Sequence, residues 1–447
     1  MNYELLKKAI EDEAKLQGLT EYEIYYMANE ELSVDTLNKE LSSFSSGNSG
    51  GICFRVLYDG KIGYASSELM DEGEMKSLVS RAKANATATE KPDTVGIFKG
   101  SEHYAELKNT DYSLKSAAEL KKISTDLADA LYNSSDKVTN GTATYGVTAG
   151  FTVRLSNSHG LNLETKCGVN LVQAMAVICD EGKYENAYDA KELKGEVDVN
   201  EIAKGVVEEA ILKANAGPIE SGKYSVVLSG KQMRTILSAF VSAFSAKMAQ
   251  MGMSLLKGKE GEKIAADIVT ITDDPMREGV SIQTNFDAEG VAAFRKAVVE
   301  NGVLKTLLHN RETAKAQGVE STGNASKGGY ASPVAISPYA FCMEAGDKTK
   351  DELFAMAGNG IYITELKGLH AGANAVTGDF SIESAGFKIE NGKLAGAVKS
   401  FTIAGNFFDL LKSIAALSNE VEVAITGGFT TFGAPAVLIH DVSVAGK

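Results

Sequence analysis

Apolar and polar positions along the chain follow first a helical and then an alternating period. The apolar residues of the first segment recur at helical spacing: Leu5, Leu6, Ala9, Ile10 and Leu16. This stripe stops at Gly18, which predicts an N-terminal helix that docks on a sheet.

Strands are predicted next, at Tyr22–Met27 and Gly51–Tyr58, because both segments are rich in aromatic and β-branched residues. Asp59-Gly60, directly after the second strand, is the strongest short hairpin signal of the chain. The preceding segment, residues 46–51, consists of Ser, Gly and Asn. It lacks the Lys of a phosphate-binding loop and continues into a strand, so it is predicted to be a loop between strands.

Helical patterns return at about Gly73–Ala86 and Ser113–Tyr132. An antiparallel meander is then predicted, with strands at Ala143–Ala149, Phe151–Ser156, Gly160–Val169 and Leu171–Cys179. A helix follows at Asn200–Ala214 and is ended by Asn215-Ala216-Gly217-Pro218. The main domain boundary is therefore placed at residues 220/221, with a further break within the first domain near residues 110–137.

Beyond this boundary, Tyr224–Leu228 has the pattern of a buried strand and Lys231–Gln250 that of a helix with few charges. Short strands punctuated by glycine follow, with one late helix at about Asn406–Leu417. The predicted fold class is α+β. Residues 1–220 are expected to form a domain of helices packed on a largely antiparallel sheet, and residues 221–447 a larger, β-rich, barrel-like domain.

The amino-acid composition argues against several classes of function. The chain has 447 residues and a net charge of −14, which disfavours binding to nucleic acids and to anionic membranes. Its four cysteines form no C-x-x-C pair, and no window has the roughly 18 apolar residues of a membrane span. These features predict a cytoplasmic protein.

Residue patterns of common catalytic sites are missing. The five histidines are scattered, so no helix carries two imidazoles one turn apart, as a helical metal site requires. His159 and His440 are predicted to be surface or packing residues. G-x-S-x-G and Walker A motifs are absent as well. Asp273-Asp274-Pro275, taken alone, is predicted to be a solvated turn rather than a cation site. No catalytic residue and no metal ligand is assigned.

Several segments, in their order and spacing, resemble the TldD/PmbA family. In the C-terminal half these are Asp273-Asp274-Pro275, Phe286–Gly290, Asn301–Leu304, Ser321–Ala325, His370–Phe380, Ile389–Lys393 and Ile403–Asn406. In the N-terminal half they are Gly50–Val56 and Gly63–Ala65. The resemblance spans nearly the whole chain and is strongest from Tyr224 onward.

The resemblance implies a peptidase system made of two related chains. In the catalytic branch, TldD, a helix with an H-E-x-x-x-H motif and a late cysteine hold zinc. The corresponding helix here, Thr235–Ser245, has neither His nor Glu, and the late loop Thr426–Gly433 has no Cys. This is the pattern of the PmbA branch, also called TldE. The chain is thus expected to be inactive alone and to form a dimer. Zinc is expected in a TldD-like partner, and the substrate is expected to be an unfolded peptide.

The glycine-rich segment around His370 is the predicted peptide contact, since glycine lets a backbone approach closely and His370, Asn374 and Asp379 can offer polar groups. The alternative is that Gly372 and Gly378 serve tight turns and that Asn374 bonds to nearby backbone. Likewise, the apolar helix Thr235–Phe244 is predicted to be core, with a partner interface as the alternative.

Two other functions stay open on sequence alone. One is a homo-oligomeric scaffold, of the gyrase-modulator type that the family has also been labelled, which binds a peptide or protein without hydrolysis. The other is an autonomous hydrolase, which would require a Ser or Cys beside a His and a carboxylate in one cleft.

Overall fold

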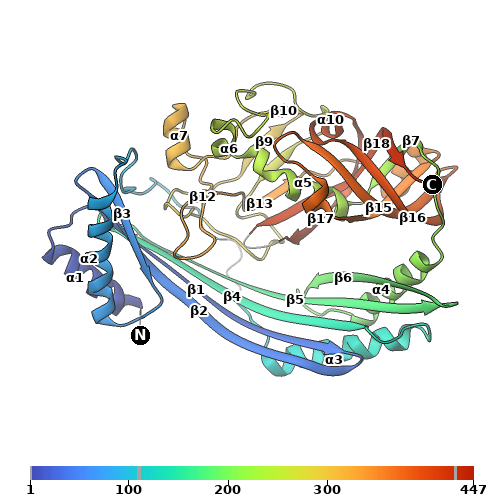
Figure 1. The fold of residues 1–447 in the computed structure, drawn as a ribbon, viewed down its shortest axis with the longest axis horizontal. Coiled ribbons are helices and arrows are strands. Elements are labelled where there is room, and N and C mark those ends of the chain that lie inside the picture. The colour runs from blue at the N-terminus through green and yellow to red at the C-terminus, as the bar shows by residue number, and fades with distance from the viewer. Residues whose placement is uncertain (1–2, 108–111, 427–429) are drawn as a thin grey trace.

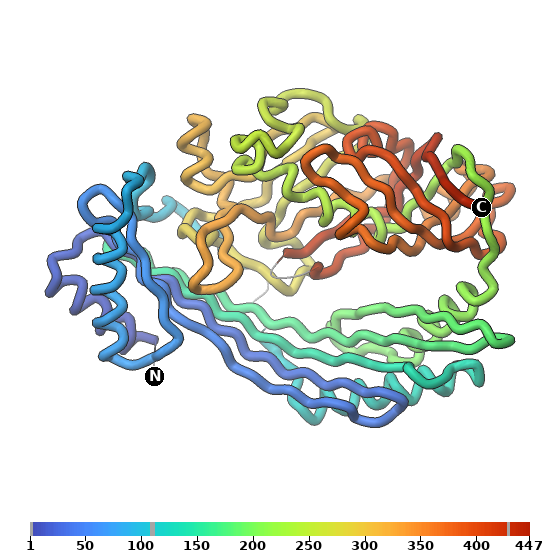
Figure 2. Tube along the Cα trace, in the orientation of Figure 1, coloured from blue at the N-terminus to red at the C-terminus, as the bar shows by residue number. Residues whose placement is uncertain are grey.

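The computed structural model describes residues 3–107, 112–426 and 430–447, which form two sheet-centred parts (Figures 1 and 2). The first part contains a six-stranded antiparallel sheet of order β3-β2-β1-β4-β5-β6. Its strands are β1 (Tyr22–Leu37), β2 (Glu40–Tyr58), β3 (Lys61–Ser67), β4 (Ala143–Asn157), β5 (Asn162–Asp180) and β6 (Lys183–Glu192). Its helices are α1 (Tyr3–Leu16), α2 (Glu72–Ala88), α3 (Ala117–Ser134) and α4 (Val199–Ala214).

The strands of this sheet are longer than predicted. The four predicted meander strands are only two, β4 and β5, because their internal glycines are not turns. A Cβ on Gly150 would lie 2.2 Å from the Tyr112 hydroxyl, and one on Gly168 would lie 3.0 Å from Leu114. These glycines give room to the segment that crosses the sheet face.

The prediction of a loop at residues 46–51 is also wrong, since this segment is the middle of β2. It pairs without a break with β1, from Leu32 opposite Ser46 to Met27 opposite Gly51. A long partner strand overrides the weak strand propensity of Ser and Gly. The hairpin prediction is confirmed: Asp59 and Gly60, with φ of 51° and 72°, join β2 to β3.

Helices cover the outer face of the first sheet. At one end α1 and α2 pack on β1–β3, and at the other end α3 and α4 cover β4 and β5 (Figure 1). Val172, Ala174, Ala176 and Ile178, at alternate positions of β5, are buried beneath α3 and α4. This period of two is typical of a strand with one covered face.

The second part is built on a ten-stranded mixed sheet. Its strands are β7 (Gly222–Leu228), β8 (Ile271–Asp273), β9 (Lys296–Glu300), β10 (Val303–Leu304), β13 (Ala340–Met343), β14 (Gly360–Lys367), β15 (Asp379–Glu390), β16 (Lys393–Asn406), β17 (Ile414–Ile425) and β18 (Thr431–Ala445). β11 (Ala325–Ser326) and β12 (Ala335–Ile336) form a separate pair. The helical segments are α5 (Gly230–Phe240), η1 (Val241–Phe244), α6 (Ala246–Gln250), α7 (Arg311–Gln317), α8 (Lys350–Ala357), α9 (Leu369–Gly372) and α10 (Phe407–Lys412).

Five of these strands close a ring, because β18 pairs with both β16 and β7, and β15 and β14 complete the circle. The main core lies against α5, whose Phe240 stacks on Phe407 with ring centroids 4.6 Å apart. The α+β class and the barrel-like second part are confirmed. The chain enters β7 at Gly222, directly after the predicted boundary; that residues 1–220 and 221–447 are separate domains stays a prediction.

Two helix predictions need correction. The predicted helix Lys231–Gln250 is broken into α5, η1 and α6, because the chain is extended at Ser245, where it bridges to Leu308. The late helix ends at Lys412, since the chain from Ile414 onward pairs with β18.

The first sheet arches beneath the second part, and its inner face is turned toward it (Figure 1). The two parts touch where loops of the second part, near Phe286 and Ala325, pack on Tyr25, Met27 and Leu155 of the sheet. Within the described ranges, no helix has the length and apolar character needed to cross a membrane.

Candidate functional site

The contact between the two parts is centred on Asp287, a fully buried residue of the segment Phe286–Gly290. Its carboxylate accepts the backbone N–H groups of Glu289, Val291 and Ala325 at 2.9–3.0 Å. Burial, with a smaller effect of the nearby Glu289 carboxylate, nevertheless raises the pKa of Asp287 to about 8. The carboxylate thus holds two loops together in an environment that disfavours its charge.

A charged cluster adjoins Asp287. Glu289 accepts the backbone N–H of Arg311 at 2.8 Å, and Arg55 of β2 pairs with Glu23 of β1 at 3.1 Å. Burial raises the pKa of Glu289 and lowers that of Arg311. Each part therefore contributes one acidic and one basic group to the contact, so that the buried charges have partners of opposite sign.

A second buried ion pair lies deeper in the second part. Lys296 Nζ is 3.0 Å from Asp273 Oδ2, and Asn324 Nδ2 donates to the same oxygen at 2.7 Å. The other oxygen accepts the backbone N–H groups of Tyr339 and Ala340. The prediction of a solvated turn is therefore wrong for Asp273, which is fully buried and joins two of the segments that carried the resemblance.

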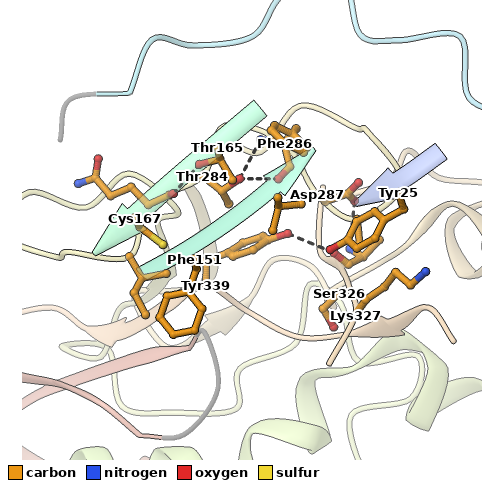
Figure 3. A pocket seen from close by; sticks show the side chains of 15 residues that line it. Tyr25, Phe151, Thr165, Cys167, Thr284, Phe286, Asp287, Ser326, Lys327 and Tyr339 are labelled. Carbon is orange, nitrogen blue, oxygen red and sulfur yellow. Dashed lines mark hydrogen bonds between the residues drawn. The ribbon is translucent and has the colours of Figure 1, made fainter. Parts of the chain in front are cut away.

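An apolar pocket opens beside this contact (Figure 3). It has a volume of about 90 Å³, and its walls come from β1, β4 and β5 and from loops of the second part. Phe151 and Cys167 lie on one side and Tyr25 on the other (Figure 3). Burial raises the pKa of Cys167 to about 12, so its thiol stays protonated and unreactive near neutral pH.

Two of the predicted peptide contacts lie together in one turn. Asn374 donates its N–H to the Asp379 carbonyl at 2.9 Å, and its side chain accepts the N–H of Val376 at 3.0 Å. The Asp379 carboxylate accepts a hydrogen bond from Asn406 Nδ2 at 3.0 Å. Asn374 thus has the backbone bonds weighed as its alternative role, whereas the Asp379 carboxylate bonds to a side chain, and a contact of either residue with a peptide stays a prediction. His370 is exposed on the preceding helix, α9, and its contact with a peptide stays a prediction.

A serine–histidine pair lies on the barrel surface, where Ser225 Oγ is 2.9 Å from His440 Nδ1. His440 is exposed, as predicted. Among the described residues, no carboxylate within bonding distance orients this imidazole. The pair therefore lacks the third group of a catalytic triad.

Two family models match the chain. The PmbA/TldA metallopeptidase C-terminal domain matches residues 221–446, and PmbA/TldA metallopeptidase domain 1 matches residues 22–86. This chain belongs to the PmbA/TldD metallopeptidase family. Among its relatives, an uncharacterized protein of Methanocaldococcus jannaschii is 32% identical over 90% of this chain and 92% of its own length. A metalloprotease PmbA homolog of Haemophilus influenzae is 27% identical over 88% and 86%.

Solved PmbA/TldD structures share the whole architecture. A Thermotoga maritima protein, described as a candidate modulator of a DNA gyrase, has a TM-score of 0.90 at 30% identity, covering 99% of this chain and 100% of that one. TldE of Thermococcus kodakarensis has a TM-score of 0.88 at 22% identity, covering 98% and 100%, which shows a shared fold. The resemblance drawn from the sequence is confirmed.

The described residues do not fit the zinc that the family name implies. On α5, which the resemblance aligns with the metal-binding helix, both charged residues, Lys231 and Arg234, are cationic and would repel a metal ion. Ile236 and Phe240 are buried in the core, as predicted for this helix. No group of three His, Cys, Asp or Glu side chains is placed to hold a metal within the described part of the chain. Residues 427–429 of the late loop lie outside that part.

Asp273, Asp287 and Glu289 lie in segments that carried the resemblance, but no role was predicted for their carboxylates. Arg55 and Arg311 carried no signal, since their partners are distant in sequence.

Proposed function

We propose that this PmbA/TldD-family chain is the TldE-like, zinc-free subunit of a two-chain peptidase, in which a TldD-like partner binds zinc and this chain completes the substrate chamber. The observation that carries the proposal is α5. A zinc-bound water needs anionic or imidazole ligands and an open position, whereas this helix offers cations, hydroxyls and apolar side chains. Family membership and the PmbA name of a relative support a role in proteolysis.

In this proposal the chain's own residues bind and orient an unfolded peptide. They take no part in activating water. His370, exposed beside the turn of Asn374 and Asp379, is the proposed polar contact with the peptide backbone. The substitution His370→Ala would then weaken cleavage by the assembled enzyme through KM and leave kcat unchanged.

The test uses the full chain alone and mixed with the TldD-like protein of the same organism. Zinc content and cleavage of an unstructured peptide are measured in each sample. Cleavage only in the mixture, with zinc following the partner, is the expected result. Stoichiometric zinc and cleavage by this chain alone would overturn the proposal.

Two further outcomes identify the alternatives. Peptide binding with no cleavage in any mixture would favour the homo-oligomeric scaffold. Cleavage by the chain alone that disappears in Ser225→Ala, and that a chelator does not affect, would favour an autonomous hydrolase built on the Ser225–His440 pair.

A further inference from the structure

The inner face of the first sheet has few charges over three adjacent strands. Glu192 lies on this face at the end of β6, opposite Leu171, and Lys231 of α5 lies 5.2 Å from the centre of the Tyr188 ring. We define the inner strip as positions 143, 145, 147 and 149 of β4, positions 171, 173, 175, 177 and 179 of β5, and positions 184, 186, 188 and 190 of β6. None of these thirteen positions is Asp, Glu, Lys or Arg, although 23% of the chain is charged. Eleven are Ala, Val, Leu, Met, Cys or Tyr, and the other two are amides.

This strip is partly open to solvent, since five of its thirteen positions are exposed and the other eight are half-buried. The intervening positions of β4 and β5 are buried under α3 and α4, whereas none of the thirteen positions of the strip is buried. Tyr145, Tyr188 and Tyr184 are 37%, 51% and 69% exposed. A sheet face in water is ordinarily polar, and a contiguous face with Tyr and Met and without charges is typical of a binding surface.

The inner strip continues into the apolar pocket. Phe151 follows position 149 on the same face of β4, and Cys167 precedes position 171 on the same face of β5; both line the pocket. Leu171 and Ile425, at the end of β17, pack against the same cluster. The apolar residues thus continue along the sheet to the pocket, whose lining, with Phe151 and Cys167, is shown in Figure 3.

The dimensions of the strip indicate which kind of ligand it can bind. At about 3.4 Å per residue and 4.8 Å between strands, it is about 30 Å long and three strands wide, or roughly 400 Å². This is about half of the ~800 Å² per partner that a stable protein–protein interface buries. A single extended chain of about nine residues has the matching length.

We propose that the inner strip binds an extended, uncharged segment of a peptide through its apolar side chains, and that the pocket receives one aliphatic side chain. Glu31 and Asp35 of β1 lie opposite positions 149 and 145, so the border of the strip repels acidic peptides. The inference deepens the proposed function, on which it rests for the identity of the peptide. The binding itself needs neither zinc nor a partner.

The test exploits the absence of tryptophan from the chain. The probe is an N-acetylated, C-amidated nonapeptide with five central apolar residues, one of them tryptophan, and Gly-Ser at each end. Its fluorescence reports binding to the full chain alone. Met175→Lys and Tyr188→Lys place a charge in the strip. Tyr64→Lys, at a site that is 52% exposed, is the matched control for Tyr188, which is 51% exposed, and Met251→Lys is a methionine control at a more exposed site (59%).

We expect both strip variants to weaken binding at least tenfold and both controls to leave it unchanged. A nonapeptide with two of its apolar residues replaced by Glu should bind at least tenfold more weakly than the probe. Equal binding by all four variants, or no binding by the native chain, would overturn the inference. So would a native dimer, seen by sedimentation, that Met175→Lys alone dissociates, because the strip would then be a subunit interface. The subunit proposal is tested separately by zinc content and cleavage in the mixture.

Discussion

The substitution Asp287→Asn tests whether the contact between the two parts carries a proton. The pKa of Asp287 is raised from an ordinary 3.8 to about 8 in the folded chain. Folding therefore favours the protonated carboxyl. Its stabilising contribution is complete below about pH 4 and is lost as the pH rises toward 8, by about 1.4 kcal/mol per pH unit. Between pH 5 and 7 the native chain should lose roughly 2.7 kcal/mol relative to the variant, which has nothing to ionise at this position.

The substitution changes the free energy of unfolding in two opposite ways: it removes a hydrogen-bond acceptor, which destabilises the fold, and it removes a buried group that ionises, which stabilises the fold as the pH rises. At pH 5 the variant should be the less stable protein by about 1–3 kcal/mol, because an amide nitrogen cannot accept the N–H that the lost oxygen held. At pH 7 the order should be equal or reversed. Urea unfolding at pH 5, 6 and 7 measures the difference, with Asp126→Asn on the exposed face of α3 as the control for loss of a carboxylate. A difference that stays constant within about 0.5 kcal/mol would refute the assignment of a raised pKa.

Two further substitutions test the packing. Lys296→Met should lower the free energy of unfolding by about 3 kcal/mol, because the buried Asp273 loses its cation. Lys305→Met, which breaks an exposed ion pair, should lower it by less than about 1 kcal/mol. Equal shifts of the urea midpoint at pH 7 in the two variants would contradict this expectation. Gly63→Ala should cost about 1–3 kcal/mol or more, because its Cβ would meet the α2 backbone at 2.2 Å, whereas a Cβ on Gly396 has no atom within 4 Å and should be tolerated. Thermal unfolding that does not separate these two variants would show that α2 can move away from β3.

Local patterns were sufficient where a strand or helix has one covered face. The helix α4 was predicted correctly for this reason, and the Asp59-Gly60 hairpin was predicted from its specific turn residues. The glycines inside β2, β4 and β5 misled the prediction, because a glycine that makes room for a neighbour, such as Gly150 for Tyr112, cannot be distinguished locally from a turn glycine.

The partners of the buried carboxylates could not be predicted, for the same physical reason. The burial of Asp273 depends on Lys296 and Asn324, and that of Asp287 on loops more than thirty residues apart. The local sequence Asp-Asp-Pro is the same whether its carboxylates are exposed to solvent or buried in the core. The resemblance located these segments correctly but gave no indication of what they touch.

The closed ring of the second part has a consequence for biosynthesis. β7 leaves the ribosome well before its partner β18, so Leu228 has no residue to pair with until Val437 has been synthesised. At about 5–20 residues per second, this delay lasts roughly 10–40 s. Throughout it, one edge of β7 has no neighbour and the core around α5 is unsealed. Until then the unpaired edge of β7 can pair with other chains. Loss of Ser443–Ala445 would remove the pairing of β18 with β16 and leave the ring open.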